Sequence, residues 1–117
     1  MQIKTLFFEG SSKQSVLLDV RLTESFIERN RGLLALPPLS EGEGLLINPC
    51  SSIHTFSMKY PLDLVYLDKA LKIVKIVENI AANRVSLCWR AKSTLELKSG
   101  EVERLKLSVG LKGKFLE

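Results

Sequence analysis

Short runs of β-forming residues, most of them joined by links of hairpin length, limit this 117-residue chain to a sheet-based fold. The clearest pair is 64–67 and 71–77, because only Asp68-Lys69-Ala70 separates the two runs and so short a link favours an antiparallel hairpin. The turn-forming residues 9–13 separate the first two runs in the same way. The expected strands are residues 2–8, 15–22, 45–47, 64–67, 71–77, 93–97 and 114–116.

Two short helices are expected beside these strands. Residues 24–34 carry apolar side chains at helical spacing after Thr23, which can cap the helix, and Pro37-Pro38 prevents its continuation. A second helix of about one and a half turns follows Ser99, its expected N-cap, with acidic residues first and basic residues last, as the helix dipole favours. Because no alternation of strands with helical crossovers is visible, we expect an α+β fold with a mainly antiparallel, curled, barrel-like sheet of about seven strands.

The length and composition fit a single globular domain over residues 1–117. The net charge of +4 is small, and acidic residues interrupt the basic ones along the chain, so binding to nucleic acid is unlikely on this ground. Glu9 ends the first apolar run before it reaches the length of a signal core, and no later run approaches a membrane span. We therefore expect a cytoplasmic protein that does not associate with membranes; the sequence does not indicate its oligomeric state.

The two cysteines, Cys50 and Cys88, do not form a metal-binding or redox motif. They are far apart in the sequence, and a single histidine leaves too few ligands for a zinc site. We expect two reduced thiols, no metal and no cofactor, and the sequence leaves open whether the thiols lie close together.

The segment 53–68 carries the densest set of chemically active side chains, including the only histidine, His54. In an extended segment, His54, Phe56 and Met58 share one face, and Lys59 follows at its end. A histidine in such company serves either as a hydrogen-bonded structural group or as part of a pocket wall.

Three carboxylates accompany this segment. Asp63 can cap a turn or pair with Lys59, and Asp68 at a hairpin corner is typical of a turn residue that bonds the backbone two residues on. Glu96 alternates with Leu95 and Leu97, so its side chain must lie on an exposed face or be held by a cation such as Arg90 or Lys59. Structural and catalytic roles therefore remain open for Asp63 and Glu96.

Trp89 and Arg90 form an adjacent aromatic and guanidinium pair. Such a pair can line an anion-binding or ring-binding site through stacking and bidentate hydrogen bonds, or the indole can simply cover the core. A shared pocket requires that residues 54–59 and 89–96 come together in the fold.

The order of several short motifs resembles the family known as domain of unknown function 192. The resemblance covers residues 18–115 and implies a compact β-rich fold without an established biochemistry. It rests on Gly32-Leu33-Leu34, Glu43-Gly44-Leu45-Leu46, Ile53-His54-Thr55-Phe56-Ser57-Met58, Pro61-Leu62-Asp63, Tyr66-Leu67-Asp68, Leu95-Glu96-Leu97, Gly100 and Val109-Gly110.

Three classes of function are compatible with these residues. The first is a module that binds a small anionic metabolite or sugar in a pocket lined by His54, Phe56, Met58, Lys59, Trp89 and Arg90. The second is an enzyme in which Asp63 or Glu96 orients His54 as an acid or base. The third is a nucleic-acid or protein-binding barrel that uses aromatic side chains as stacking platforms, although the three carboxylates oppose nucleic acid in this region.

Overall fold

The computed structural model describes residues 2–9, 15–23, 38–55 and 58–116, and its elements are mostly strands. The helix expected at residues 24–34 lies outside the described residues, and the described part contains one short helix rather than two. The elements are β1 Gln2–Glu9, β2 Ser15–Leu22, β3 Glu43–Ile47, β4 Ser52–His54, β5 Leu62–Leu67, β6 Ile73–Ile80, β7 Val85–Leu87, β8 Ser93–Lys98, α2 Glu101–Leu105 and β9 Gly113–Leu116.

Seven of the strands form one mixed sheet in the order β6-β5-β8-β3-β2-β1-β9. The expected hairpins are confirmed, since β1 pairs antiparallel with β2 and β5 pairs antiparallel with β6. The sheet is mainly antiparallel, as expected, but it is mixed, because β2 and β3 are parallel, with Asp19 opposite Glu43. Two neighbouring parallel strands need a long crossover connection, and the chain between Leu22 and Glu43 supplies it. The sequence predicts a helix and a loop for this connection but does not indicate that it joins parallel strands.

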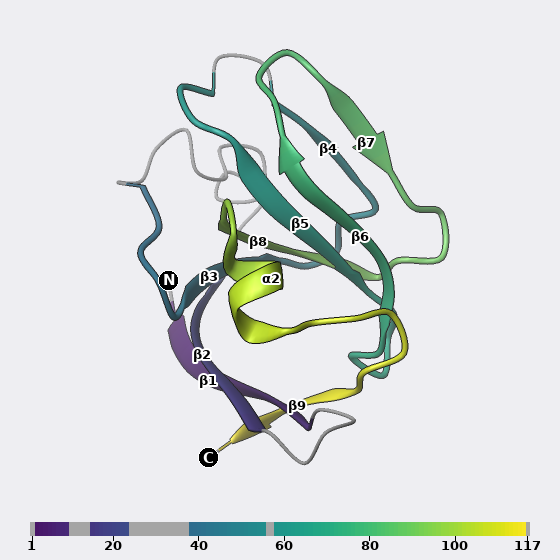
Figure 1. Ribbon diagram of the computed structural model, residues 1–117. Coiled ribbons are helices and arrows are strands. Elements are labelled where there is room, and N and C mark those ends of the chain that lie inside the picture. The colour runs from purple at the N-terminus through teal and green to yellow at the C-terminus, as the bar shows by residue number, and fades with distance from the viewer. Residues whose placement is uncertain (1, 10–14, 24–37, 56–57, 117) are drawn as a thin grey trace.

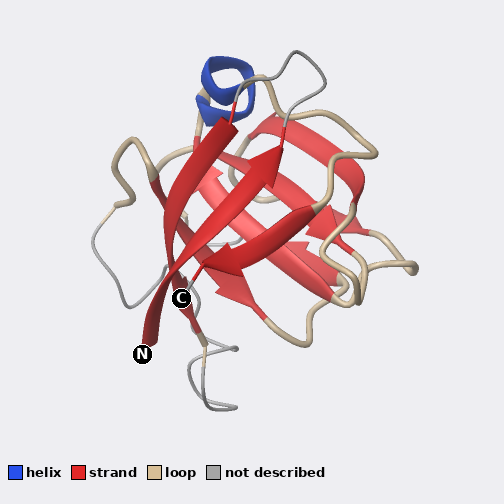
Figure 2. Cartoon of the chain, turned by 90° about the horizontal axis from the view of Figure 1, so that it is seen from below, coloured by secondary structure: helices blue, strands red, loops and turns tan. Residues whose placement is uncertain are grey.

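The sheet curls until its two edges approach each other (Figure 1). The N–H of Ile73 at the start of β6 donates to the carbonyl of Leu111 at 2.8 Å, and the N–H of Gly110 donates to the carbonyl of Ile73 at 2.8 Å. The isolated bridge between Lys72 and Lys112 continues the same contact toward β9. The predicted barrel-like curvature is therefore present, and Figure 2 shows the strands wrapped around the core with the helix at one end.

The curled sheet encloses the first of two apolar cores. Strand residues alternate between its faces, so Leu95 and Leu97 of β8 point into this core while Glu96 points to the other face. Val102 of α2 and the following Leu107 close one end. The buried members are Leu6, Phe8, Val16, Leu18, Val20, Leu46, Val65, Leu67, Ile73, Leu95, Leu97, Val102 and Leu107.

The second core lies under a separate two-stranded ribbon of β4 and β7, which forms an outer layer beside β5 and β6 (Figure 1). The strand Val85–Leu87 of this ribbon is not among the strands expected from the sequence, because three residues give only a weak alternating pattern. The buried residues of this core are Leu39, Leu45, Ile47, Ile53, Leu62, Leu64, Tyr66, Ile80 and Cys88.

The helix α2 is where the sequence predicts it, but Ser99 is not its cap. The N-cap is Gly100, whose φ of 96° is left-handed and suits a residue without a Cβ atom. The Ser99 hydroxyl instead donates to Oδ1 of Asn79 at 2.7 Å. Among the described helices, none has the length and apolar character needed to cross a membrane.

Candidate functional site

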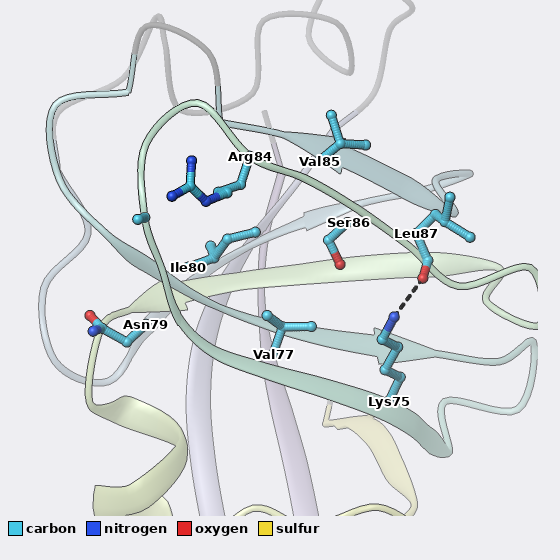
Figure 3. A pocket seen from close by; sticks show the side chains of 9 residues that line it. Lys75, Val77, Asn79, Ile80, Arg84, Val85, Ser86 and Leu87 are labelled. Atoms are coloured by element: carbon cyan, nitrogen blue, oxygen red, sulfur yellow. Dashed lines mark hydrogen bonds between the residues drawn. The ribbon is translucent and has the colours of Figure 1, made fainter.

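A surface hollow lies between β6 and β7, and we call it the β6–β7 hollow (Figure 3). Its volume is about 680 Å³, which is within the range of small-molecule sites. The chain connects β6 to β7 through residues 81–84, yet the two strands belong to different sheets and stay apart. The lining residues are Lys75, Val77, Asn79, Ile80, Ala81, Arg84, Val85, Ser86 and Leu87.

Thr55 holds the connection between β6 and β7 in place. This residue is almost fully buried, and its hydroxyl donates to the carbonyl of Ala81 at 2.7 Å while accepting the N–H of Arg84 at 2.8 Å. Its carbonyl also accepts the N–H of Asn83 at 3.1 Å. One side chain thus fixes both ends of the turn, and this sets the position from which Arg84 projects.

Two side-chain bonds hold β7 in its position above the main sheet. The buried Tyr66 of β5 donates its hydroxyl to Oγ of Ser86 at 2.9 Å. Burial raises the pKa of Tyr66, so the phenol keeps the proton that it donates. On the other side of the hollow, Nζ of Lys75 donates to the carbonyl of Leu87 at 2.8 Å, as Figure 3 shows.

The β6–β7 hollow combines an apolar floor with positive charge. Val77 and Ile80 form apolar parts of its wall, while Arg84 and Lys75 supply two cations, and none of the nine lining residues is acidic. The Arg84 guanidinium is exposed, and its recorded bond is a long one of 3.4 Å from Nη1 to the carbonyl of Asn83. This arrangement favours a ligand that carries negative charge and some apolar surface.

A second hollow of about 300 Å³, which we call the Tyr60 hollow, lies beside the first and shares Asn79 and Ala81 with it. Two residues predicted to bind a ligand, Met58 and Lys59, line this hollow. Its lining is likewise free of acidic residues and consists of Met58, Lys59, Tyr60, Pro61, Asn79, Ala81 and Ala82.

The other predicted pocket residues lie outside both hollows. β4 and β7 pair antiparallel, and His54 stands opposite Val85, at the end of the ribbon farther from Trp89. Trp89 is 84% exposed, and Nη2 of Arg90 donates to the carbonyl of Val74 at 3.3 Å. Phe56 lies outside the described residues.

Asp63 is fully buried, and of its two expected roles the capping one holds, because its carboxylate binds backbone amides rather than Lys59. Its Oδ1 accepts the N–H of Asn79 at 2.8 Å. Its Oδ2 accepts the N–H of Gly100 at 3.1 Å and that of Val102 at 2.9 Å. The carboxylate therefore caps α2 from a distant strand, which indicates a structural role.

Glu96 is only 5% exposed, and the structure records no cation beside it among the described residues, which corrects the expected pairing with Arg90 or Lys59. Leu45 and Leu64 stand opposite it on the two flanking strands. Burial raises the pKa of Glu96 to about 7. Its Oε2 and the buried hydroxyl of Tyr60 have no hydrogen-bond partner in the described part of the chain.

The carboxylates that were candidates to orient His54 are engaged elsewhere or buried. The recorded partners of Asp63 are three backbone amides, and Glu96 has no recorded partner among the described residues. A histidine that acts as an acid or base with a carboxylate must form a hydrogen bond with it. Within the ranges that it describes, the structure records no such bond between His54 and Asp63 or Glu96.

The two thiols belong to the second core. Cys88 is buried and Cys50 packs against the same cluster, and both are free. The N–H of Cys88 donates to the carbonyl of Ser51 at 2.8 Å, so the two cysteine-bearing segments are neighbours. In the described ranges, no group of three or more histidine, cysteine or acidic residues is placed to hold a metal ion.

Sequence reasoning missed Arg84 and Lys75. Neither residue belongs to a recognisable motif, and only the separation of β6 from β7 places both in the lining of one hollow. The alternation Val85-Ser86-Leu87 was the one available signal for a strand at this place.

Comparison with known proteins identifies relatives by family and by fold. Residues 8–115 match the model of a protein family described as "DUF192: Uncharacterized ACR". A candidate transcription regulator from Sinorhizobium meliloti is 21% identical, with a TM-score of 0.88 over 97% of this chain and 94% of that chain. A protein of unknown function from Novosphingobium aromaticivorans is 20% identical, with a TM-score of 0.85 over 97% and 86% of the two chains. The comparison with curated proteins gave no match.

Proposed function

The chain belongs to the DUF192 family, whose model covers residues 8–115, and we propose that it is a binding module for small anionic ligands that uses the β6–β7 hollow. The single observation that carries this proposal is that Arg84 and Lys75 line one hollow that has an apolar wall and no acidic residue in its lining. A guanidinium binds carboxylate and phosphate oxygens through paired hydrogen bonds, and a nearby ammonium adds charge.

The proposal keeps the class of ligand that the sequence favours and moves the centre of the site. Met58 and Lys59 lie in the adjoining Tyr60 hollow, so an anion bound near Arg84 is close to residues that the sequence selected. His54, Trp89 and Arg90 remain candidates for contacts outside the two hollows.

Binding of anions is tested by NMR titration of the ¹⁵N-labelled protein with inorganic phosphate, citrate, glutarate and glucose 6-phosphate. We expect at least one of these probes to shift the amide signals of Val85, Ser86 and Leu87 in a saturable manner. Arg84→Gln is expected to weaken that binding about tenfold, because a charge-assisted hydrogen bond is worth about 1.5 to 3 kcal/mol and 1.4 kcal/mol corresponds to a factor of ten.

Lys69→Gln is the control that also removes one positive charge, because Lys69 is exposed in the turn between β5 and β6 and lies outside the hollow. It is expected to leave the affinity unchanged. Equal losses in the two variants, or the absence of any saturable shift at β7, would contradict the proposal.

We further propose a cytoplasmic location. The support for this location is the two free thiols, Cys50 and Cys88, which a reducing compartment preserves. Fractionation of cells that express the protein from its own gene tests this location.

A further inference from the structure

The β6–β7 hollow lies beside the open edges of two strands. β6 is the last strand on its side of the seven-stranded sheet, and β7 pairs only with β4 in the described part of the chain. The hollow therefore has along its walls the kind of backbone that pairs with a further extended chain.

The recorded hydrogen bonds show which backbone groups of β7 face the hollow side. The carbonyl of Arg84 accepts the N–H of Thr55 at 2.8 Å, and the N–H of Cys88 donates to Ser51, so residues 84 and 88 direct these groups toward β4. Because backbone groups alternate along a strand, those of Val85 and Leu87 are directed to the opposite edge. This edge is available for a third strand of the ribbon.

Lys75 occupies the place that a neighbouring strand would take at this edge. Its Nζ donates to the carbonyl of Leu87 at 2.8 Å, a bond that an adjacent strand would otherwise supply from its backbone. A side-chain amine can be displaced by a backbone N–H, and it then becomes free to pair with a carboxylate of the incoming chain.

We propose that the ligand of the β6–β7 hollow is an acidic peptide in extended conformation, which adds to β7 as the third strand of the β4–β7 ribbon. This inference rests on the anion-binding function proposed above and specifies its ligand. Carboxylate side chains of the peptide meet Arg84 and Lys75, and its backbone pairs with Val85 and Leu87.

The two faces of the ribbon define which peptide fits. Val85 and Leu87 are 63% and 58% exposed, so the outer face offers apolar cross-strand contacts. Arg84 and Lys75 lie in the hollow on the other side. Since side chains of a strand alternate between its faces, the expected peptide alternates apolar and acidic residues.

The Tyr60 hollow also favours an acidic ligand. It shares Asn79 and Ala81 with the β6–β7 hollow and brings a third cation, Lys59, without any acidic lining residue. Two adjoining basic hollows suit a chain-like ligand better than a compact anion, because each accommodates a different part of the chain.

The test compares an acetylated and amidated Val-Glu-Val-Glu-Val peptide with glutarate, a free dicarboxylate. We expect the peptide to bind at least about tenfold more tightly than glutarate and to protect the amides of Val85 and Leu87 from hydrogen exchange. A peptide with methylated backbone nitrogens is expected to lose that advantage, and its Gln-containing counterpart is expected to bind more weakly than the acidic one.

Leu87→Pro provides a variant that separates the two proposals, because it removes an N–H at the open edge while the recorded bonds to β4 come from residues 84 and 88. It is expected to lose peptide binding and retain glutarate binding, whereas Leu87→Ala keeps the backbone N–H, loses only an apolar contact, and is therefore expected to weaken peptide binding much less and to retain glutarate binding. Equal affinities for peptide and glutarate, or no effect of backbone methylation, overturn the strand-addition inference and leave anion binding intact. Absence of peptide binding overturns the strand-addition inference, and the anion-binding proposal falls with it only if glutarate and the three other anionic probes also fail to bind. This comparison uses the unaltered protein, so it stands even where Leu87→Pro fails to fold.

Discussion

Asp63 and Val102 are 39 positions apart in sequence, and Oδ2 of the buried Asp63 carboxylate accepts the N–H of Val102 at 2.9 Å. The same carboxylate also binds the N–H groups of Gly100 and Asn79, so it joins three segments: strand β5, the end of β6 and the start of α2. A carboxylate in this position satisfies amides that the first turn of a helix leaves without intrahelical partners.

Asp63→Asn is expected to destabilise the fold by about 2 to 3 kcal/mol, because an amide nitrogen replaces one acceptor oxygen and leaves at least one buried N–H without a partner. The free energy of unfolding, measured by urea titration, checks this expectation. Asp68→Asn is the control, since Asp68 is less buried and binds two amides of an exposed turn through Oδ1 alone. Equal losses in the two variants would show that burial of the Asp63 cap is not decisive.

Glu96 is expected to make the stability of the protein depend on pH. Its pKa is raised from 4.5 to about 7 in the fold, so between these values the folded state holds a proton that the unfolded state has released. The contribution of protonated Glu96 to the free energy of unfolding is therefore fully present below pH 4.5, is lost as the pH rises from 4.5 through 7, and changes little above that. The total loss is about 3 kcal/mol at 1.36 kcal/mol per pKa unit.

Glu96→Gln is expected to remove this loss, because the amide carries no charge to bury. The measurement is the free energy of unfolding of both proteins at several pH values from 4 to 9, compared as a difference so that other titrating groups cancel. Glu78→Gln, at an exposed position of β6, is the control, and its free energy of unfolding is expected to decline with rising pH as in the wild type. A parallel pH dependence of wild type and Glu96→Gln would rule out Glu96 as its source.

Local sequence patterns were sufficient where the interacting residues are neighbours in the chain. The hairpin of β5 and β6 and its corner were predictable, and Asp68 indeed accepts the N–H of Ala70 at 2.8 Å. The alternation around Glu96 correctly placed Leu95 and Leu97 on the other face. It did not reveal that a second layer covers the Glu96 face, because that layer comes from strands of three residues each.

The site was less predictable than the fold for the same physical reason. His54 and Trp89 were placed in one pocket because both lie in chemically rich segments, yet the antiparallel register of β4 and β7 puts them toward opposite ends of the ribbon. Arg84 and Lys75 line one hollow only because β6 and β7 separate after a short turn that Thr55 holds. Such long-range register is not encoded in any single short motif.

Thr55→Val is expected to lower the free energy of unfolding by about 1 to 3 kcal/mol, because the isosteric change leaves the carbonyl of Ala81 and the N–H of Arg84 without their partner. Hydrogen exchange of the Arg84 amide is expected to accelerate as well. Thr5→Val serves as the control: its hydroxyl makes an exposed bond to Asp19, so we expect a change within about 0.5 kcal/mol. Unchanged exchange at Arg84 would mean that Thr55 does not hold the turn.

The bond from Tyr66 to Ser86 is expected to couple the position of β7 to the core. Tyr66→Phe and Ser86→Ala each remove the hydrogen bond, so in a double-mutant cycle their effects on the free energy of unfolding should not add, with a coupling of about 0.5 to 1.5 kcal/mol. Because the phenol holds one wall of the β6–β7 hollow, Tyr66→Phe is also expected to weaken the binding of anions there. Strict additivity of the two substitutions would show that the bond contributes nothing to the placement of β7.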